Sequence, residues 1–191
     1  TLTTSMKSVG EAMAIGRTFK ESLQKALRSL ETGRWGFGFD SKMPKNPSTD
    51  EISRKLAVPN AERIFWLQTA FAHGFTAEEI HDITQIDPWF LAQLEDLAIS
   101  GERLSDIPLE KAKKLGFSDR QIALARGESE DSVRDERKKR GIVPTYRLVD
   151  TCAAEFEAYT PYYYSCYGDE NEARPSDKKK IMILGGGPNR I

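Results

Sequence analysis

The 191-residue sequence has little cysteine and little histidine, with two residues of each. Cys152 and Cys166 are too few for a disulfide framework and lack the companion ligands of a zinc site, so we expect two unpaired thiols. His73 and His81 lie eight residues apart, no nucleophile stands beside a base, and no acidic pair has a recognisable metal-ligand spacing. The sequence therefore predicts neither a catalytic constellation nor a metal site.

Long apolar runs and an excess of one charge are absent as well. Runs such as residues 181–184 are far shorter than the roughly 20 residues that span a bilayer. The first residues lack the charged and apolar regions of a signal peptide. The net charge of −1 gives no overall preference for nucleic acid or anionic membrane. We therefore expect a protein of the cytoplasm or an equivalent reducing compartment.

Signals for helix starts are abundant. Residues 60–101 alone contain three, namely Asn60 as a cap, Thr76 with Glu79 as a capping box, and Asp87 followed by Pro88. Apolar residues recur behind each signal at three- and four-residue spacing, and Gly74 can end the first helix. Further starts are predicted at Thr18 with Glu21, where Gly33 can end the helix, and at Ser48 with Glu51. The fold class predicted for most of the chain is mainly α.

Residues 33–47 alternate glycine with aromatic residues and then contain prolines. This composition predicts a loop that packs Trp35, Phe37 and Phe39 against the helices. An aromatic and glycine run can also stack on nucleic-acid bases, although no basic groove accompanies this one.

The helical region contains an internal repeat. Residues 74–80 are matched 42 residues later by residues 116–122, with glycine, phenylalanine and isoleucine identical. Each copy is followed by a turn and a second helix, opened by Asp87 in one case and by Ser129 in the other. We therefore predict two stacked helix-turn-helix units.

The second unit also has an alternative interpretation as a DNA-reading helix-turn-helix. Residues 108–141 hold ten Lys+Arg against seven Asp+Glu, a net charge of +3. The basic cluster at residues 137–140 lies at the C-terminal end of its helix, where the helix dipole favours cations, whereas DNA-reading residues usually lie near the N-terminal end. DNA binding is therefore kept as an alternative function.

The character of the chain changes after Gly141. Residues 144–150 and 160–167 favour strands, and residues 168–180 resemble a solvated linker. Residues 181–184 then lead into glycines, as a buried strand does in an α/β nucleotide-binding unit, but neither the dinucleotide fingerprint nor a P-loop is complete. One strand cannot form a sheet alone, so we expect this segment to belong to a truncated α/β domain.

Three motifs carry a family resemblance. They are MKSVGEAMAIGRT at residues 6–18, VDTCAAEF at residues 149–156 and KIMILGGGPNRI at residues 180–191. In order and spacing they closely resemble the large chain of carbamoyl-phosphate synthase, and they bracket the helical region. The match covers the whole sequence but only a small part of that enzyme.

The resemblance implies a domain organisation. Residues 1–18 are similar to the end of a first ATP-grasp half, and residues 19–143 to a helical oligomerisation domain. Residues 144–178 resemble the connection to the second half, and residues 179–191 its first strand and glycine loop. The implied architecture is a helical domain flanked by short extended segments of truncated ATP-grasp-type domains.

The implied function is that of a non-catalytic connecting and oligomerisation domain. The intact family enzyme is an ATP-dependent ligase that makes carbamoyl phosphate for arginine and pyrimidine biosynthesis. It uses bicarbonate, ammonia released from glutamine by a small partner chain, and two ATP with magnesium or manganese. The family's ATP-binding and metal-binding residues have no counterpart here, so these 191 residues are expected to be inactive alone.

Four residues are candidates for functional positions. By resemblance, Met6 and Glu11 fall where the family lines a carbamate tunnel; alternatively, Glu11 pairs with a neighbouring Arg or Lys. Trp66 and Trp89 are candidates for association contacts, with core packing as the alternative. The expected partners are the remaining ATP-grasp halves, the glutaminase small chain and further copies of the chain, with no nucleic acid and no membrane.

Overall fold

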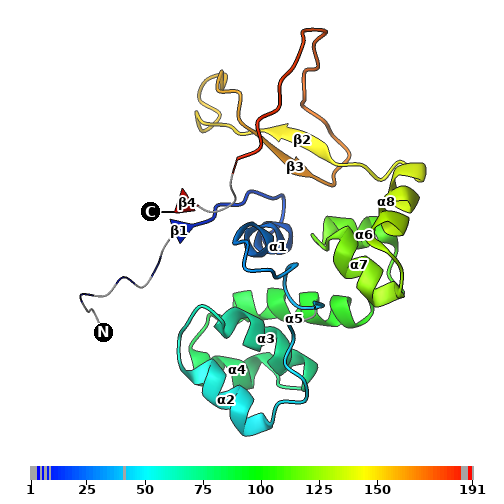
Figure 1. Ribbon diagram of the computed structural model, residues 1–191. Helices are drawn as coiled ribbons and strands as arrows, with labels where there is room; N and C mark the ends of the chain where they lie inside the picture. Colours follow the sequence, from blue (N-terminus) through cyan, green and yellow to red (C-terminus); the bar gives the residue numbers. More distant parts are fainter. Residues whose placement is uncertain are drawn as a thin grey trace.

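The computed structural model describes residues 4, 6, 8, 10–40, 42–185 and, for the backbone alone, 189–190. Helices dominate the described part, which confirms the mainly α fold class (Figure 1). The helices are α1 (Phe19–Ser29), α2 (Thr49–Ala57), α3 (Arg63–Ala72), α4 (Ala77–Thr84), α5 (Pro88–Glu102), α6 (Leu109–Lys114), α7 (Asp119–Arg126) and α8 (Glu130–Lys139). The strands are β1 (Gly10–Glu11), β2 (Thr145–Leu148), β3 (Tyr163–Cys166) and β4 (Asn189–Arg190). Among the described residues, no helix is both long and apolar enough to cross a membrane.

The core lies around α5. Helices α2, α3 and α4 pack against one another and, through α3 and α4, against α5, and α1 contacts α5 as well. Figure 1 shows α1 on one side of α5 and the α2–α4 group on the other, with α6, α7 and α8 beyond its C-terminal end. The apolar side chains that face inward at helical spacing, such as Ile52, Leu56, Leu91 and Leu97, are fully buried.

Most of the predicted helix starts are confirmed. The Thr76 and Glu79 capping box is complete, and Asp87 accepts a hydrogen bond from the Trp89 amide at 2.8 Å with Pro88 in the first turn. Ser48 likewise caps α2. These signals are local in sequence, so they are satisfied without help from the rest of the fold.

Three boundary predictions were wrong in detail. Asn60 does not cap α3, because its side chain accepts the Glu62 amide in a preceding turn and the helix begins at Arg63. The Thr18 box is incomplete, because the Glu21 carboxylate accepts the Arg17 amide instead of that of Thr18. Helix α1 ends at Ser29, before Gly33, which lies in the following loop with a φ of +75°.

The internal repeat extends to the backbone geometry. Ser118 and Gln121 form a second complete capping box, 42 residues after the first. Each copy begins after a glycine with positive φ, Gly74 or Gly116, and buries its isoleucine completely. Ser129 caps α8 as Asp87 caps α5. The two helix-turn-helix units predicted from the sequence are therefore present, but their stacking is not confirmed, because α5 packs mainly against α3, α4 and α1, and α7 mainly against α8.

The loop of residues 33–40 packs against the helices, as predicted, and the structure places it between α5 and α7. Phe37 is fully buried, and the ring of Phe39 lies 6.5 Å from that of Phe117. Buried glutamines hold the loop backbone, because Gln24 accepts from the Phe37 amide at 2.7 Å and Gln121 donates to the Gly38 carbonyl at 3.0 Å. The loop therefore joins α1, α7 and the helical core.

Two short antiparallel sheets complete the described fold. Strands β2 and β3 pair with Thr145 opposite Cys166, and β1 pairs with β4 through Gly10 opposite Arg190. Residues 181–184, predicted as a buried strand, form none, and each of their apolar side chains is at least 85% exposed. Within the described chain this segment has no neighbouring strand, so its backbone lacks ladder partners.

Candidate functional site

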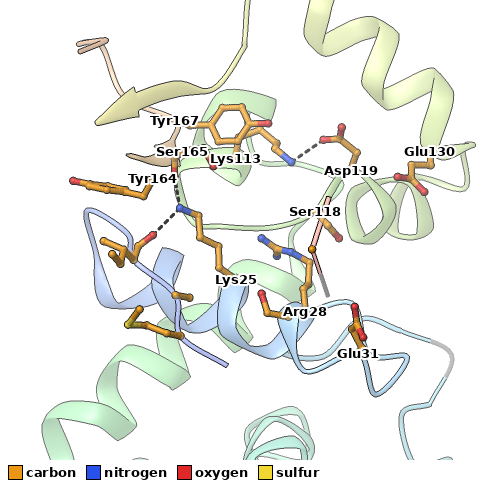
Figure 2. Close-up of a pocket in the computed structure, with 15 residues that line it drawn as sticks. Lys25, Arg28, Glu31, Lys113, Ser118, Asp119, Glu130, Tyr164, Ser165 and Tyr167 are labelled. Atoms are coloured by element: carbon orange, nitrogen blue, oxygen red, sulfur yellow. Dashed lines mark hydrogen bonds and ion pairs between the residues drawn. The ribbon is translucent and has the colours of Figure 1, made fainter. Parts of the chain in front are cut away.

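A sizeable pocket lies where several parts of the described chain meet. It has a volume of about 660 Å³ and is bordered by the segment before α1, by α1 and the residues after it, by the α6–α7 region, by the start of α8, by β3 with the residue after it, and by Gly185 (Figure 2). Its lining consists of Met13, Ala14, Ile15, Lys25, Arg28, Ser29, Glu31, Lys113, Ser118, Asp119, Glu130, Tyr164, Ser165, Tyr167 and Gly185. We call it the junction pocket.

Lys25 connects three of these parts. Its ammonium donates to the Ile15 carbonyl at 2.8 Å and to the Ser165 carbonyl, and lies 3.3 Å from the Glu21 carboxylate one turn earlier on α1. The ring of Tyr164 faces the same ammonium at 5.8 Å. One side chain thus fastens the segment before α1 and the β2–β3 hairpin to the helical body.

A second group of charges lies deeper, around Asp119. Its carboxylate accepts from Lys113 at 2.7 Å and from Arg137 at 3.1 Å, and all three side chains are about nine-tenths buried. Lys113 also donates to the Phe117 carbonyl, and the Tyr167 ring lies against both cations, 5.1 Å from the ammonium and 5.8 Å from the guanidinium. Arg28 reaches in from α1 and donates to the Gly116 carbonyl at 2.7 Å.

Burial shapes the electrostatics of this group. Removal from water is the main cause that lowers the pKa of Lys113 and of Arg28, and the nearby guanidinium groups of Arg28 and Arg137 lower the pKa of Lys113 further. Burial by itself would raise the pKa of Asp119, but the hydrogen bonds and charges of Lys113 and Arg137 outweigh it and hold that pKa below its ordinary value. The pKa of the Tyr167 phenol is raised, mainly by burial. Asp119 is therefore an ionised anchor between two cations.

The sequence did not predict the junction pocket. Lys25 donates a hydrogen bond to a residue 140 positions away, and Arg28 to one 88 positions away. A local sequence pattern cannot predict contacts between residues so far apart in the chain. The available signal was modest: Glu21, Lys25 and Arg28 follow one another at four- and three-residue spacing and so share one face of α1.

The structure does not bring the two predicted tunnel residues into this pocket. Met6 is 66% exposed, and Glu11 lies on β1 with an exposed side chain. Neither is among the residues that line the pocket.

The two predicted association residues differ in their surroundings. Trp66 packs partly buried against the core, with the Lys55 ammonium 5.5 Å from its ring. Trp89 is 54% exposed and makes ring contacts with Phe19 and Phe90 at centroid distances of 5.4 and 5.0 Å. Phe90 is itself 44% exposed, so we call Phe19, Trp89 and Phe90 the aromatic cluster.

Ion pairs offset much of the positive charge on α8 and beside it. Arg134 pairs with Glu130 and Asp131. Arg126 and Arg140 both pair with Glu136, at 2.8 and 2.7 Å. Because these cations are already neutralised by carboxylates of their own helical unit, the alternative of a DNA-reading helix-turn-helix is not supported.

The described residues do not fit a metal centre. Nowhere in residues 10–40 and 42–185 do three or more His, Cys, Asp or Glu side chains converge in a way that could hold an ion.

Comparison with known proteins gives consistent matches. The family described as "Carbamoyl-phosphate synthetase large chain, oligomerisation domain" matches residues 11–141. A carbamoyl phosphate synthase large chain from Synechocystis sp. is 58% identical over 199 residues, covering all of this chain and 18% of the relative. The large chain of Archaeoglobus fulgidus is 51% identical over 202 residues, covering 100% of this chain and 19% of the relative. The chain thus spans less than a fifth of the length of these relatives.

Proposed function

The chain belongs to the family of the carbamoyl-phosphate synthetase large chain, within which it matches the oligomerisation domain, and from this we propose that it is a non-catalytic connecting and self-association unit of that enzyme. The connecting role is supported by one observation above all. Strands β1 and β4, one from each of the two segments that resemble flanking synthetase halves, pair side by side. The helical body therefore stands beside a point where both segments meet.

The junction pocket supports the same role. Lys25 ties residue 15, which follows β1, and residue 165, which lies in the hairpin, to α1. The Asp119 group then ties the region around α6, α7 and α8 together. A domain that makes polar contacts to the connecting segments is suited to fixing their relative position, and the described residues that do so include no nucleophile and base pair.

The test is a deletion in a full-length large chain that contains this sequence, which we call the longer large chain. Residues 49–141, which make up α2 to α8, are replaced by a short Gly/Ser linker. We expect the deletion variant to lose both normal assembly and most of the carbamoyl-phosphate synthesis, measured by sedimentation and by product formation. The matched control replaces the exposed residues 175–178 of the connection with a linker of equal length and should retain both. A deletion variant that keeps synthesis and assembly would exclude the proposal.

The self-association role is supported by the aromatic cluster. Three aromatic rings in mutual contact, two of them about half exposed, form an apolar surface at the start of α1 and α5. Exposed aromatic groups of this kind mark protein interfaces. We assign this surface to a second copy of the chain, since the family is described as an oligomerisation domain. Trp89 is therefore a stronger contact candidate than the more deeply packed Trp66.

The finer features of the enzyme follow from the family as proposals. The longer chain would be an ATP-dependent ligase of the cytoplasm, using bicarbonate, ammonia from a glutaminase small chain, and ATP with magnesium or manganese, for arginine and pyrimidine biosynthesis. Residues 1–18 and 179–191 would belong to its two synthetase halves, residues 19–143 would form the oligomerisation domain, and residues 144–178 the connection. Met6 and Glu11 would line its carbamate tunnel.

A further inference from the structure

The inner wall of the junction pocket carries more positive than negative charge. Three basic side chains, Lys25, Arg28 and Lys113, line it, and of the three carboxylates in the lining Asp119 is the buried one. Arg137 and Glu21 lie behind this lining, paired with Asp119 and Lys25. The other carboxylates of the pocket lining are less buried, because Glu31 is exposed and the side chain of Glu130 is 41% exposed. Water screens these outer charges, so they offset the inner cations only in part.

Arg28 is the cation with the most unused capacity. A guanidinium has five N–H donors, and among the described residues the hydrogen-bond acceptor of Arg28 is the Gly116 carbonyl. Figure 2 shows its guanidinium pointing into the pocket, beneath the Lys113 and Asp119 pair. By contrast, the ammonium groups of Lys25 and Lys113 each have two or more partners. Burial lowers the pKa of both Arg28 and Lys113, as expected where positive charge is incompletely compensated.

We propose that the junction pocket binds an anionic oxygen group, a carboxylate or a phosphate, through the guanidinium of Arg28 and the positive charge of Lys113. Arginine presents paired donors that match either group, and charge-assisted hydrogen bonds of this type are the strong ones. The volume of about 660 Å³ accommodates such a group with room for a larger ligand around it. The group could be a free anion or an acidic side chain from another part of the longer large chain.

Inorganic phosphate is the probe for the 191-residue chain. The midpoint of thermal unfolding is measured at pH 7 in increasing phosphate and, at equal ionic strength, in chloride. A ligand that binds the folded state raises the midpoint as its concentration passes the dissociation constant. We expect a saturating rise in phosphate, and at least about a tenfold weaker apparent affinity for Arg28→Gln.

Control variants separate binding from general salt effects. Phosphate also stabilises proteins by exclusion from their surface, and this effect should be equal in all variants. Arg54→Gln removes an exposed guanidinium on α2, outside the pocket, and should respond as the wild type does. Arg28→Lys keeps the charge, and circular dichroism checks that each variant is folded. Equal midpoints in phosphate and chloride, or an undiminished response of Arg28→Gln, would overturn the proposal.

The same titration on the longer large chain identifies the source of the anion. If that chain also gains stability through Arg28, the site takes a free anion. If it does not respond to phosphate while Arg28→Gln destabilises it more than Arg54→Gln, an acidic group of the longer chain occupies the site. If neither the phosphate response nor the Arg28→Gln effect is seen there, the proposal is wrong for the intact enzyme.

Discussion

Lys25 joins three parts of the structure, namely α1, the segment before it and strand β3. Its ammonium neutralises Glu21 and satisfies two carbonyls from distant segments. Glu21 is 4% exposed, and without Lys25 its buried carboxylate would keep the Arg17 amide but lose its ion pair. The stability of the junction should therefore depend on this one charge.

We predict that Lys25→Met, which keeps the apolar stem and removes the ammonium, lowers the free energy of unfolding by about 1–3 kcal/mol. Urea denaturation measures the change. Lys20→Met on the same helix removes an ion pair with the more exposed Asp96 and should cost less than about 1 kcal/mol. Equal effects of the two substitutions would show that Lys25 is an ordinary surface lysine.

Asp119 should contribute a pH-dependent part of the stability. Its pKa in the folded protein lies below the ordinary value of about 3.9, so its contribution is complete above that pH and is lost as the pH falls through the folded pKa. We predict that Asp119→Asn lowers the unfolding midpoint at pH 6 and that its difference from the wild type shrinks toward pH 2. Thermal unfolding across this range is the measurement. The control Asp96→Asn should change the unfolding midpoint only slightly at every pH in this range. If Asp119→Asn lowers the midpoint by the same amount at every pH, the contribution of an ionised Asp119 to stability is contradicted.

At the scale of elements, the sequence could predict the helix boundaries that depend on local signals. Capping residues such as Thr76 and Ser118 act within three residues, so both boxes could be identified in advance. The repeat was visible for the same reason. Its second copy diverges where packing is no longer local: Leu94 of α5 is 3% exposed, whereas Glu136, 42 residues later, forms ion pairs with two arginines. The aromatic and glycine loop was predicted to pack against the helices. Its hydrogen bonds with Gln24 and Gln121 could not be predicted, because these glutamines lie on helices outside the loop.

The contact of this loop with α5 gives an element-scale prediction. Gly101 is buried, and a Cβ there would lie 1.9 Å from Cε2 of Phe39. Glycine to alanine in a helix is usually stabilising by about 1 kcal/mol, but here the clash should dominate. We predict that Gly101→Ala destabilises the protein by about 1–3 kcal/mol in urea denaturation. The double variant Gly101→Ala with Phe39→Leu should recover part of the loss, and additive effects would mean that the two sites do not touch.

At the scale of the whole molecule, the described structure is a helical body with two sets of contacts. The junction pocket and the β1–β4 pair lie toward the connecting segments, and the aromatic cluster lies at the start of α1 and α5. The family resemblance rests on motifs that are contiguous in sequence, so it could be stated without the structure. Which of the two tryptophans is exposed depends on how helices pack, and only the structure distinguishes them.

The most direct test of self-association is the mass of the longer large chain measured by sedimentation over a wide concentration range. We predict reversible association of the wild type, weakened at least about tenfold by Trp89→Ala with Phe90→Ala, since buried aromatic anchors dominate interface energies. Leu124→Ala, an exposed apolar residue on α7, should leave association unchanged. A strictly monomeric wild type would contradict the self-association role, and an unaltered double variant would exclude the aromatic cluster as its contact.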